Sequence, residues 1–334
     1  MNSQQIAHNL SKWYQKNKRD LPFRETNDPY RIWISEIMAQ QTQISQLLPY
    51  YQRWITLWPT IESLAQASID EVNKAWEGLG YYRRASHILK TSQILVQQYA
   101  GQFPKTHAEI LSLPGIGPYT AGAICSIAYE LPTAAVDGNV IRVLSRWLGD
   151  DADFSKIANK RKLETMIEEF MLYQQPSVIN QALMELGALV CTFRNPSCAA
   201  CPLRHSCKAY QSNEIEKYPF QKPKKEKVIE HYRVFLHIQD HQLLISNDDR
   251  DGLMKGFVRL PQIKEDFIPF KQARFISQNK HVFSHKIWQM DVYEVFEPLK
   301  KLSSTQYIPI QEIEDYAWIT AHKKILLDYL ANNS

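Results

Sequence analysis

Three features are missing from this sequence of 334 residues, and each absence excludes a class of protein. It contains no apolar run of about 18 residues, the length that a membrane-spanning helix needs. Its first 19 residues are polar and do not form the apolar core of a signal peptide. A strong charge excess is also missing, because 39 Lys and Arg against 35 Asp and Glu leave a net charge of only +4, which does not by itself indicate a nucleic-acid partner. We therefore expect an intracellular, cytoplasmic protein with no membrane partner, in which any anion is bound by a local arrangement of groups.

The length and composition favour a folded chain with more than one domain. A chain of 334 residues exceeds what one hydrophobic core usually holds. Hydrophobic residues make up 44% of it, with 17 Tyr, 13 Phe and 8 Trp, enough to build cores rather than remain disordered. No repeat at a solenoid period is visible.

The first 210 residues are expected to be almost wholly helical. Asp28 followed by Pro29 predicts the N-cap and first position of a helix that runs as far as Ile44. Residues 68–71 and 106–109 fit the capping box, in which a hydroxyl and a Glu satisfy backbone donors at a helix start. Further helices are predicted over residues 3–17, 43–57, 82–99, 118–129, 138–148, 155–173 and 176–190.

The pattern changes after residue 210. Residues 211–228 combine two prolines with a run of lysines and have no helical or strand period, which indicates a linker. Short β-rich runs follow, such as residues 232–238 and 289–296, and a helix is predicted over 321–331. We therefore predict a smaller α+β domain over residues 229–334.

Four of the five cysteines fall within 17 residues. Cys191, Cys198, Cys201 and Cys207 are separated by six, two and five residues and supply enough thiolates for a zinc ion or an iron–sulfur cluster. Disulfides are less favoured in a reducing compartment. The single CxxC pair with more distant flanking cysteines favours the wider cluster, acting as a redox-inert staple, and leaves zinc as the alternative. Cys125 stands alone in an apolar stretch and is predicted to be a core residue.

A glycine-containing turn is predicted between two helices. Gly115 and Gly117 precede the helix that Pro118 opens. Glycines allow a tight turn and a close approach of backbone N–H groups to an anion, and the helix N-terminus adds its positive dipole end. The turn is therefore either a sequence-independent phosphate-binding site or an ordinary connection between helices.

Two carboxylates are candidates for acid–base chemistry. Helical spacing places Glu36, Gln40 and Gln43 on one face of a helix, with Glu36 at the edge of the buried side. The amides of Gln40, Gln41 and Gln43 could reach base edges in a groove. Glu36 either faces solvent or, next to apolar walls, acquires a raised pKa and acts as a general acid. Asp137 precedes a helix and is predicted to be its N-cap, a role compatible with stabilising a cation.

Together these motifs resemble the helix-hairpin-helix DNA glycosylases that carry an iron–sulfur cluster and, within them, the adenine DNA glycosylases of the MutY type. The resemblance covers nearly the whole chain. It rests on the cysteine spacing and on Trp33–Gln43 (WISEIMAQQTQ), Leu113–Tyr119 (LPGIGPY) and Val136–Val140 (VDGNV).

The family resemblance implies a division of the chain. A six-helix barrel with the helix-hairpin-helix is expected over residues 30–130, and an iron–sulfur helical domain over residues 1–29 and 131–210. A linker over residues 211–228 and a Nudix-like domain over 229–334 follow. The four cysteines are expected to hold a [4Fe-4S] cluster.

The second domain resembles the one with which this family senses 8-oxoguanine. Phe283, Ser284 and His285 match its recognition loop, in which the serine is expected to hydrogen-bond the oxidised base. Residues 229–334 contain no Nudix box of metal-binding glutamates. The domain is therefore expected to bind without hydrolysing nucleotides.

The resemblance implies an enzyme that hydrolyses the N-glycosidic bond of adenine paired with 8-oxoguanine or guanine in duplex DNA, acting as a monomer. Adenine inside a duplex must be extruded from the stack. Tyr81, which follows a Gly-Leu-Gly sequence, resembles the family residue that wedges into the opposite stack.

The chemistry of excision is then divided among a few residues. Glu36 is expected to protonate N7 of adenine and later to act as a base toward water. Asp137 is expected to stabilise the oxocarbenium-like sugar electrostatically or through a transient covalent bond. Tyr119 and Asn139 resemble the groups that orient these carboxylates, and Arg24 the residue that holds the base from its other edge. Relatives that also cleave the strand carry a Lys where Tyr119 stands, so hydrolysis without an efficient lyase step is expected.

Three alternatives are less favoured. An endonuclease III type enzyme for oxidised pyrimidines would carry that Lys and would not need the second domain. A non-enzymatic iron–sulfur DNA-binding or redox module is disfavoured because Glu36 and Asp137 are both present. A Nudix pyrophosphatase would need the missing glutamates.

Overall fold

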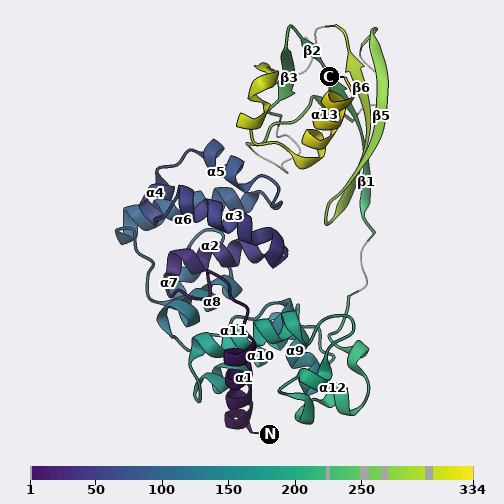
Figure 1. Cartoon of the computed structure of the whole chain (residues 1–334). Helices are drawn as coiled ribbons and strands as arrows, with labels where there is room; N and C mark the ends of the chain where they lie inside the picture. The colour runs from purple at the N-terminus through teal and green to yellow at the C-terminus, as the bar shows by residue number, and fades with distance from the viewer. Residues whose placement is uncertain (1, 223–225, 249–255, 265–269, 298–303, 334) are drawn as a thin grey trace. The chain divides into compact units, whose positions relative to one another are not determined.

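The computed structural model describes residues 2–222, 226–248, 256–264, 270–297 and 304–333. The chain forms two compact units (Figure 1). The first, here called the helical unit, comprises Met1–Ala65 and Lys90–Lys222; the second, the mixed unit, comprises Gln66–Leu89 and Pro223–Ser334. Among the described helices, none combines the length and apolarity needed to cross a membrane. The finer division into a barrel, a cluster domain and a linker stays a prediction.

The helical unit consists of helices and the irregular segments that connect them. They are α1 (Ser3–Asn17), α2 (Pro29–Ala39), α3 (Ile44–Leu57), α4 (Ile61–Ala65), the later part of α6 (Arg83–Tyr99), α7 (His107–Ser112), α8 (Pro118–Tyr129), α9 (Gly138–Leu148), α10 (Ile157–Met171), α11 (Pro176–Leu189), η1 (Cys198–Ala200), η2 (Arg204–Ser206), α12 (Lys208–Gln211) and η3 (Ile215–Lys217). The predicted helix over 118–129 is confirmed at both ends, as is the one over 138–148.

Helix starts follow from capping side chains. Asp28 accepts a hydrogen bond from the Tyr30 amide and caps α2, and Pro29 occupies the first turn, as predicted. The predicted course of this helix as far as Ile44 is wrong, because α2 ends at Ala39 and Ile44 begins α3. The backbone of Gln41 has a φ of 61°, in the left-handed region, which cannot continue a right-handed helix.

In its described residues, the mixed unit contains two sheets and a C-terminal helix. The four-stranded sheet has the order β4-β1-β6-β5 and the three-stranded sheet the order β2-β3-β7. The elements are α5 (Ile69–Trp76), β1 (Val228–Leu236), β2 (Ile238–Gln239), β3 (Gln242–Ser246), β4 (Gln262–Ile263), β5 (Ala273–Val282), β6 (Lys286–Val295), β7 (Thr305–Pro309), η4 (Ile310–Asp315) and α13 (Thr320–Asn332). A mixed α and β composition after the helical part is therefore confirmed.

The strand pairing places distant segments together. β1 runs parallel to β6 over nine register pairs, from Val228 with Lys286 to Leu236 with Glu294. β5 and β6 form an antiparallel hairpin that turns at residues 283–285. The proposed recognition loop is therefore the tip of this hairpin.

The two predicted capping boxes differ in how fully they form. Ser68 and Glu71 form the full box at α5, with both reciprocal hydrogen bonds present. Thr106 caps α7 by accepting from the Glu109 amide, but its hydroxyl bonds the Glu109 carboxylate, so the second box is incomplete.

Candidate active site

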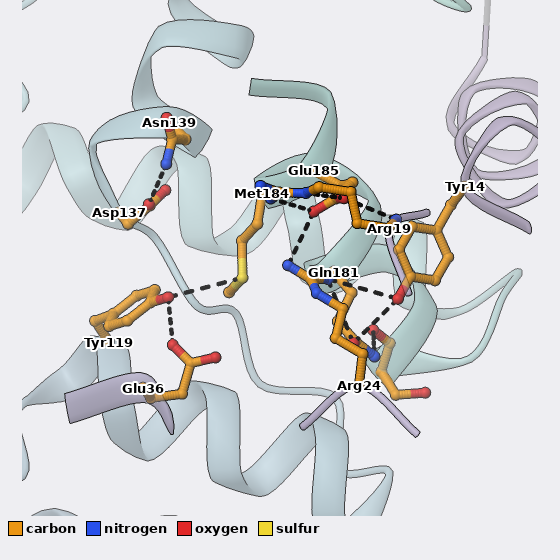
Figure 2. A network of polar contacts seen from close by, with 11 residues as sticks. Tyr14, Arg19, Arg24, Glu36, Tyr119, Asp137, Asn139, Gln181, Met184 and Glu185 are labelled. Atoms are coloured by element: carbon orange, nitrogen blue, oxygen red, sulfur yellow. Dashed lines mark hydrogen bonds and ion pairs between the residues drawn. The ribbon is translucent and has the colours of Figure 1, made fainter. Parts of the chain in front are cut away.

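Glu36 and Tyr119 form the centre of a polar site in the helical unit. α2 carries Glu36 and the first turn of α8 carries Tyr119, whose hydroxyl donates to Oε2 of Glu36 at 2.6 Å (Figure 2). The sulfur of Met184 lies 3.7 Å from the same hydroxyl. The Glu36 carboxylate is thus held in one orientation by a neighbouring phenol.

The environment of Glu36 favours its protonated form. Burial raises the pKa of Glu36, and this effect exceeds the opposing influence of the Tyr119 hydrogen bond and the positive charge of Arg24. The negative charge of Asp137 raises the pKa further. The side chain is nevertheless partly exposed, so a bound molecule can reach it. A raised pKa on an accessible carboxylate is the property that a general acid near neutral pH needs.

Asp137 is held differently, by donors on both of its oxygens. It is the N-cap of α9, and its Oδ1 accepts from the Val140 amide at 2.8 Å, as predicted. Its Oδ2 accepts from the side-chain amide of Asn139, also at 2.8 Å. These two donors fix the orientation of the carboxylate. The site therefore pairs a carboxylate in an acid-favouring environment with one fixed by donors.

Asn139 is in turn fixed by an arginine. Arg142 donates to Oδ1 of Asn139 at 2.7 Å and to the carbonyl groups of Gly187 and Cys191, both at 2.7 Å. Because the carbonyl side of the Asn139 amide is engaged by Arg142, its NH₂ group is directed at Asp137.

The backbone leading to Asp137 is fixed by a buried amide. Asn180 is fully buried on α11. Its side chain donates to the carbonyl of Thr133 at 2.9 Å and accepts from the amide of Ala135 at 3.0 Å. Asn180 thus satisfies backbone groups of residues 133–135, which belong to no helix or strand.

Two glycines let helices approach the same segment closely. A Cβ on Gly122 of α8 would lie 2.2 Å from the carbonyl oxygen of Ala134, and one on Gly187 of α11 would lie 2.7 Å from Cβ of Asn139. Both distances are shorter than real Cβ atoms allow. Glycine at these positions therefore sets how near α8 and α11 lie to the segment that carries Asp137.

Arg24 belongs to an ion-pair network that no sequence motif predicted. Glu185 of α11 has a fully buried side chain and accepts from Arg19 at 2.6 Å and 2.9 Å, and Nη2 of Arg24 lies 3.1 Å away (Figure 2). Burial raises the pKa of Glu185, but the hydrogen bonds and charges of both arginines outweigh it and lower the pKa overall. Nη1 of Arg24 also lies 3.4 Å from the side-chain oxygen of Gln181, which accepts from Tyr14 at 3.1 Å. Only the presence of a Glu within an apolar helix could have pointed to this network.

The predicted hairpin has one conformationally demanding glycine, not two. Gly115 has a φ of 75°, whereas Gly117 is extended, with a φ of −92°, and caps α8. A Cβ on Gly117 would meet no atom within 4 Å. Space is therefore open in front of the N-terminus of α8, as a closely approaching group would need.

The three glutamines lie beyond α2 rather than along it. Gln40 is the C-cap of α2, and its side-chain nitrogen lies 3.4 Å from the hydroxyl of Thr120. Gln41 and Gln43 are exposed in the connection to α3. The prediction that Gln43 shares a helical face with Glu36 is therefore wrong, because the helix ends first.

The four clustered cysteines line a single cavity. Cys191, Cys198, Cys201 and Cys207 are free thiols that surround it together with Arg146 and Leu203, among other residues. Burial raises the pKa of Cys201 to about 12, so a positively charged partner is needed to hold it as a thiolate. Within the described ranges, no group of three or more His, Cys, Asp or Glu side chains is arranged to hold a single metal ion. Four soft thiol donors around one cavity fit the larger iron–sulfur group.

Cys125 lies apart from the four clustered cysteines, whereas Arg146 contacts one of them. Cys125 is fully buried in α8, as predicted for a core residue. Arg146 is nearly fully buried, and its Nη1 donates to Sγ of Cys191 at 3.5 Å and to the carbonyl of Thr192 at 2.7 Å.

The remaining predicted residues lie in the mixed unit. Tyr81 is 48% exposed, in the connection between α5 and α6. Ser284 and His285 are exposed at the β5–β6 tip, with Oγ of Ser284 3.2 Å from Nδ1 of His285. Phe283 packs edge-on against Trp288, with ring centroids 4.8 Å apart. The sequence-predicted residues therefore fall into two groups, one in each unit.

Comparison with known proteins gives the same family repeatedly. The family model of the HhH-GPD superfamily base excision DNA repair protein matches residues 34–169. The adenine DNA glycosylase of Buchnera aphidicola subsp. Baizongia pistaciae is 35% identical over 285 residues, covering 82% of this chain and 81% of that protein. The adenine DNA glycosylase of Mus musculus is 44% identical over 213 residues, covering 61% of this chain and 41% of that protein. The chain thus spans about two fifths of the length of this mammalian relative.

Two solved structures resemble slightly less than two thirds of this chain. A thermostable thymine-DNA glycosylase superposes with a TM-score of 0.57 at 26% identity, covering 63% of this chain and 97% of its own. A non-covalent endonuclease III–DNA complex gives a TM-score of 0.53 at 22% identity, covering 64% and 98%. The second likeness is one of fold.

Proposed function

This chain belongs to the adenine DNA glycosylases, base excision repair enzymes of the HhH-GPD superfamily, and we propose that it acts on adenine paired with 8-oxoguanine or guanine in duplex DNA. In this proposal it is a monomer that hydrolyses the N-glycosidic bond and leaves the strand intact. The observation that carries the proposal is the presence of two carboxylates held by different donors: Glu36 bonded to Tyr119, and Asp137 fixed by Asn139 and the start of α9.

Glu36 acts as the acid in the first step. Its pKa is raised by burial, which favours the protonated form that a general acid needs. Tyr119 donates to Oε2, which leaves Oε1 to hold the proton and to deliver it to N7 of the extruded adenine. Protonation makes adenine a better leaving group, and general acid catalysis of this kind typically contributes about 10²- to 10⁴-fold.

Asp137 supports the positive charge that develops as adenine departs. Both of its oxygens already accept hydrogen bonds, so little reorganisation is needed as the oxocarbenium-like sugar forms. Water then adds to the sugar, and Glu36, now ionised, accepts a proton from it.

Arg24 is proposed to hold the base from its other edge, with Gln181 beside it. Arg24 is anchored by Glu185, and its positive charge acts on Glu36. Gln181 is largely buried and lies beside Arg24. Its side-chain oxygen accepts from Tyr14 and its nitrogen donates to the carbonyl of Ser177 at 3.1 Å, so it supports Arg24 from a fixed position. Extrusion itself is expected to use Tyr81 as a wedge and Gly115, Gly117 and the three glutamines as contacts to DNA.

Tyr119 also argues against strand cleavage. A lyase step needs an amine that forms a Schiff base with the sugar. The side chain of Tyr119 is a phenol and has no nitrogen with which to form such a bond.

The four cysteines would hold a [4Fe-4S] cluster. The cluster supplies a rigid inorganic centre to which four thiolates of one loop are bound. The residues of this chain do the rest: Arg142 and Arg146 bond carbonyl groups of the cysteine loop, which keeps the loop against α9.

The mixed unit is proposed to be Nudix-like and to read 8-oxoguanine. Ser284 presents an exposed hydroxyl at the β5–β6 tip, while Phe283 below it is anchored on Trp288. Lys227 donates to the carbonyl of Phe283 at 2.6 Å. An exposed donor and acceptor on an anchored tip suits recognition of a base edge.

One assay tests the proposal. Release of adenine is measured from duplexes that pair adenine with 8-oxoguanine, guanine, cytosine or thymine, under single-turnover conditions. We expect release from the first two only, no adduct on borohydride trapping, and loss of release with retained duplex binding for Glu36→Gln. Equal release from all four duplexes, a trapped adduct or an active Glu36→Gln protein would contradict the assignment.

A further inference from the structure

Tyr81 is presented on an unusually constrained connection within the mixed unit. Its own φ is 49°, and the glycines at 78 and 80 have φ values of 95° and 70°. A residue with a Cβ rarely adopts such a conformation and persists there only when its surroundings impose it. The residues that hold the connection therefore decide where the Tyr81 ring points.

The guanidinium of Arg84 packs against the ring of Tyr81. Its guanidinium carbon lies 5.4 Å from the centre of the Tyr81 ring and 5.1 Å from that of Trp76. Its Nη2 donates to the carbonyl groups of Leu79 and Gly80 at 3.2 Å and 3.0 Å. The outward face of the Tyr81 ring is left exposed while its other face is backed by a cation.

Tyr82 turns the opposite way and packs into the C-terminal part of the chain. Its ring centroid lies 4.0 Å from that of Phe257, and its hydroxyl lies 2.9 Å from that of Thr320 at the start of α13. Tyr82 is 9% exposed and Phe257 only 2%. Adjacent residues thus have opposite environments, with Tyr81 on the surface and Tyr82 in an interior.

Further contacts fix α5 to the same part of the chain. Glu77 and Glu314 both pair with Lys323, at 3.1 Å and 2.8 Å, and Lys74 bonds Glu77 at 2.8 Å. Asn73 is buried and donates to the carbonyl of Gly256 at 3.3 Å.

Gly256 itself shows how close this contact is. Its φ is 81°, and a Cβ there would lie 2.5 Å from the Asn73 amide nitrogen. Residues 66–89 are therefore built into the mixed unit by ring packing, ion pairs and the close approach of the Asn73 side chain to the backbone of Gly256.

We propose that Tyr82 is a positioning residue that holds Tyr81 ready for insertion, so that the part of the chain containing Phe257 and Thr320 sets the orientation of the wedge. This inference rests on the proposed function of Tyr81. It assigns to the C-terminal part a second contribution to mispair recognition, made through protein contacts and separate from any contact of Ser284 with the oxidised base.

The test uses the full chain and a fluorescent duplex. 2-Aminopurine is placed next to 8-oxoguanine, where its emission rises when a wedge unstacks it, and emission is measured with saturating protein in the Glu36→Gln background. Single-turnover release of adenine is measured separately with Glu36 intact. The variants are Tyr81→Ala, Tyr82→Ala, Tyr82→Phe, Phe257→Ala and the double Tyr81→Ala/Tyr82→Ala. Tyr329→Phe is the matched control, because its hydroxyl bonds Glu294 from the same helix α13.

We expect Tyr82→Ala and Phe257→Ala to abolish most of the emission rise, as Tyr81→Ala does, and to slow release by about tenfold, since each weakens the stacking of the Tyr81 ring on a base. Tyr82→Phe, which keeps the ring, should slow release by less than about threefold, in line with one hydroxyl hydrogen bond. Tyr329→Phe should match the parent protein. The double variant should be no slower than Tyr81→Ala, because Tyr82 acts through Tyr81.

Three outcomes overturn the inference, and they are distinguishable. Normal emission and release in Phe257→Ala and Tyr82→Ala, with both abolished in Tyr81→Ala, refutes the positioning role alone. Multiplied losses in the double variant show that Tyr82 acts independently of Tyr81. Normal behaviour of Tyr81→Ala refutes the wedge assignment and the inference with it. Should Tyr82→Ala fail to fold, Phe257→Ala and Thr320→Val decide the matter on the same readouts.

Discussion

Replacing Tyr119 with Phe removes the hydroxyl that donates to Glu36 and keeps the aromatic ring. The hydroxyl lies 2.6 Å from Oε2, and a hydrogen bond to a charged group contributes about 1.5–3 kcal/mol. That free energy favours the ionised carboxylate, opposing the burial that raises the pKa of Glu36. Without the donor, the ratio of protonated to ionised Glu36 at a given pH should rise by about 10- to 150-fold.

The sign of the effect follows from the role of Glu36 as an acid. Excision is lost as the pH rises through the pKa of Glu36, because the proton for adenine is then missing. Tyr119→Phe raises this pKa further, so the alkaline limb of the rate profile should move to higher pH. Single-turnover adenine release, measured between about pH 5 and 9 with the protein in excess, gives the position of the limb independently of its height.

A second tyrosine on the same helix provides the control. The hydroxyl of Tyr129, at the end of α8, donates to the carbonyl of Phe103 at 3.2 Å. Tyr129→Phe should leave the profile where it is. An alkaline limb of Tyr119→Phe that stays in place, or one that moves to lower pH, would refute the reasoning whatever the absolute rate.

Three further substitutions separate chemistry, recognition and stability. Asp137→Asn should keep the cap of α9, since Asn caps as well as Asp, yet slow adenine release by about 10²- to 10³-fold; a matching fall in the thermal midpoint would contradict this. Ser284→Ala should reduce the preference for 8-oxoguanine over guanine by about five- to tenfold, in line with one hydrogen bond, and equal losses on both duplexes would argue against a reading role. Glu185→Gln should cost about 3–5 kcal/mol in urea unfolding because Arg19 and Arg24 lose their buried partner. Glu169→Gln, on the exposed face of α10, should cost less than about 0.5 kcal/mol, and equal midpoints for the two variants would contradict the ion-pair argument.

Local signals predicted the helices of this protein well. The cap and proline at Asp28 and Pro29, the box at Ser68 and the cap at Asp137 all have a short-range cause that a sequence displays. The end of α2 was missed because Gln41 adopts a left-handed conformation that its residue type does not require. The backbone conformation of Gln41 depends on tertiary contacts, which the local sequence does not show.

Only those site residues that lie in sequence motifs could be predicted. Glu36, Tyr119, Asp137 and Asn139 lie in recognisable segments, and the structure brings them into two hydrogen-bonded pairs. Glu185 pairs with Arg24, which lies 161 positions earlier in the sequence. The residues next to Glu185 in the sequence therefore give no sign of this ion pair. Ion pairs of that kind depend on tertiary contact alone.

The grouping of residues 66–89 with the C-terminal part was not expected either. Nothing in the period or charge of this segment distinguishes it from its helical neighbours. Its partners, Phe257, Thr320 and Lys323, become visible only once the chain has folded.

The two glycines beside the Asp137 segment have a consequence for inherited variation. Every codon change at Gly122 or Gly187 that alters the residue adds at least one carbon atom, and that carbon would overlap Ala134 or Asn139. A variant at either position carries no missing donor, acceptor or charge, so an inspection limited to reactive side chains would pass it as harmless. Tolerance to mutation around this carboxylate is therefore set as much by positions that must stay empty as by the residues that carry functional groups.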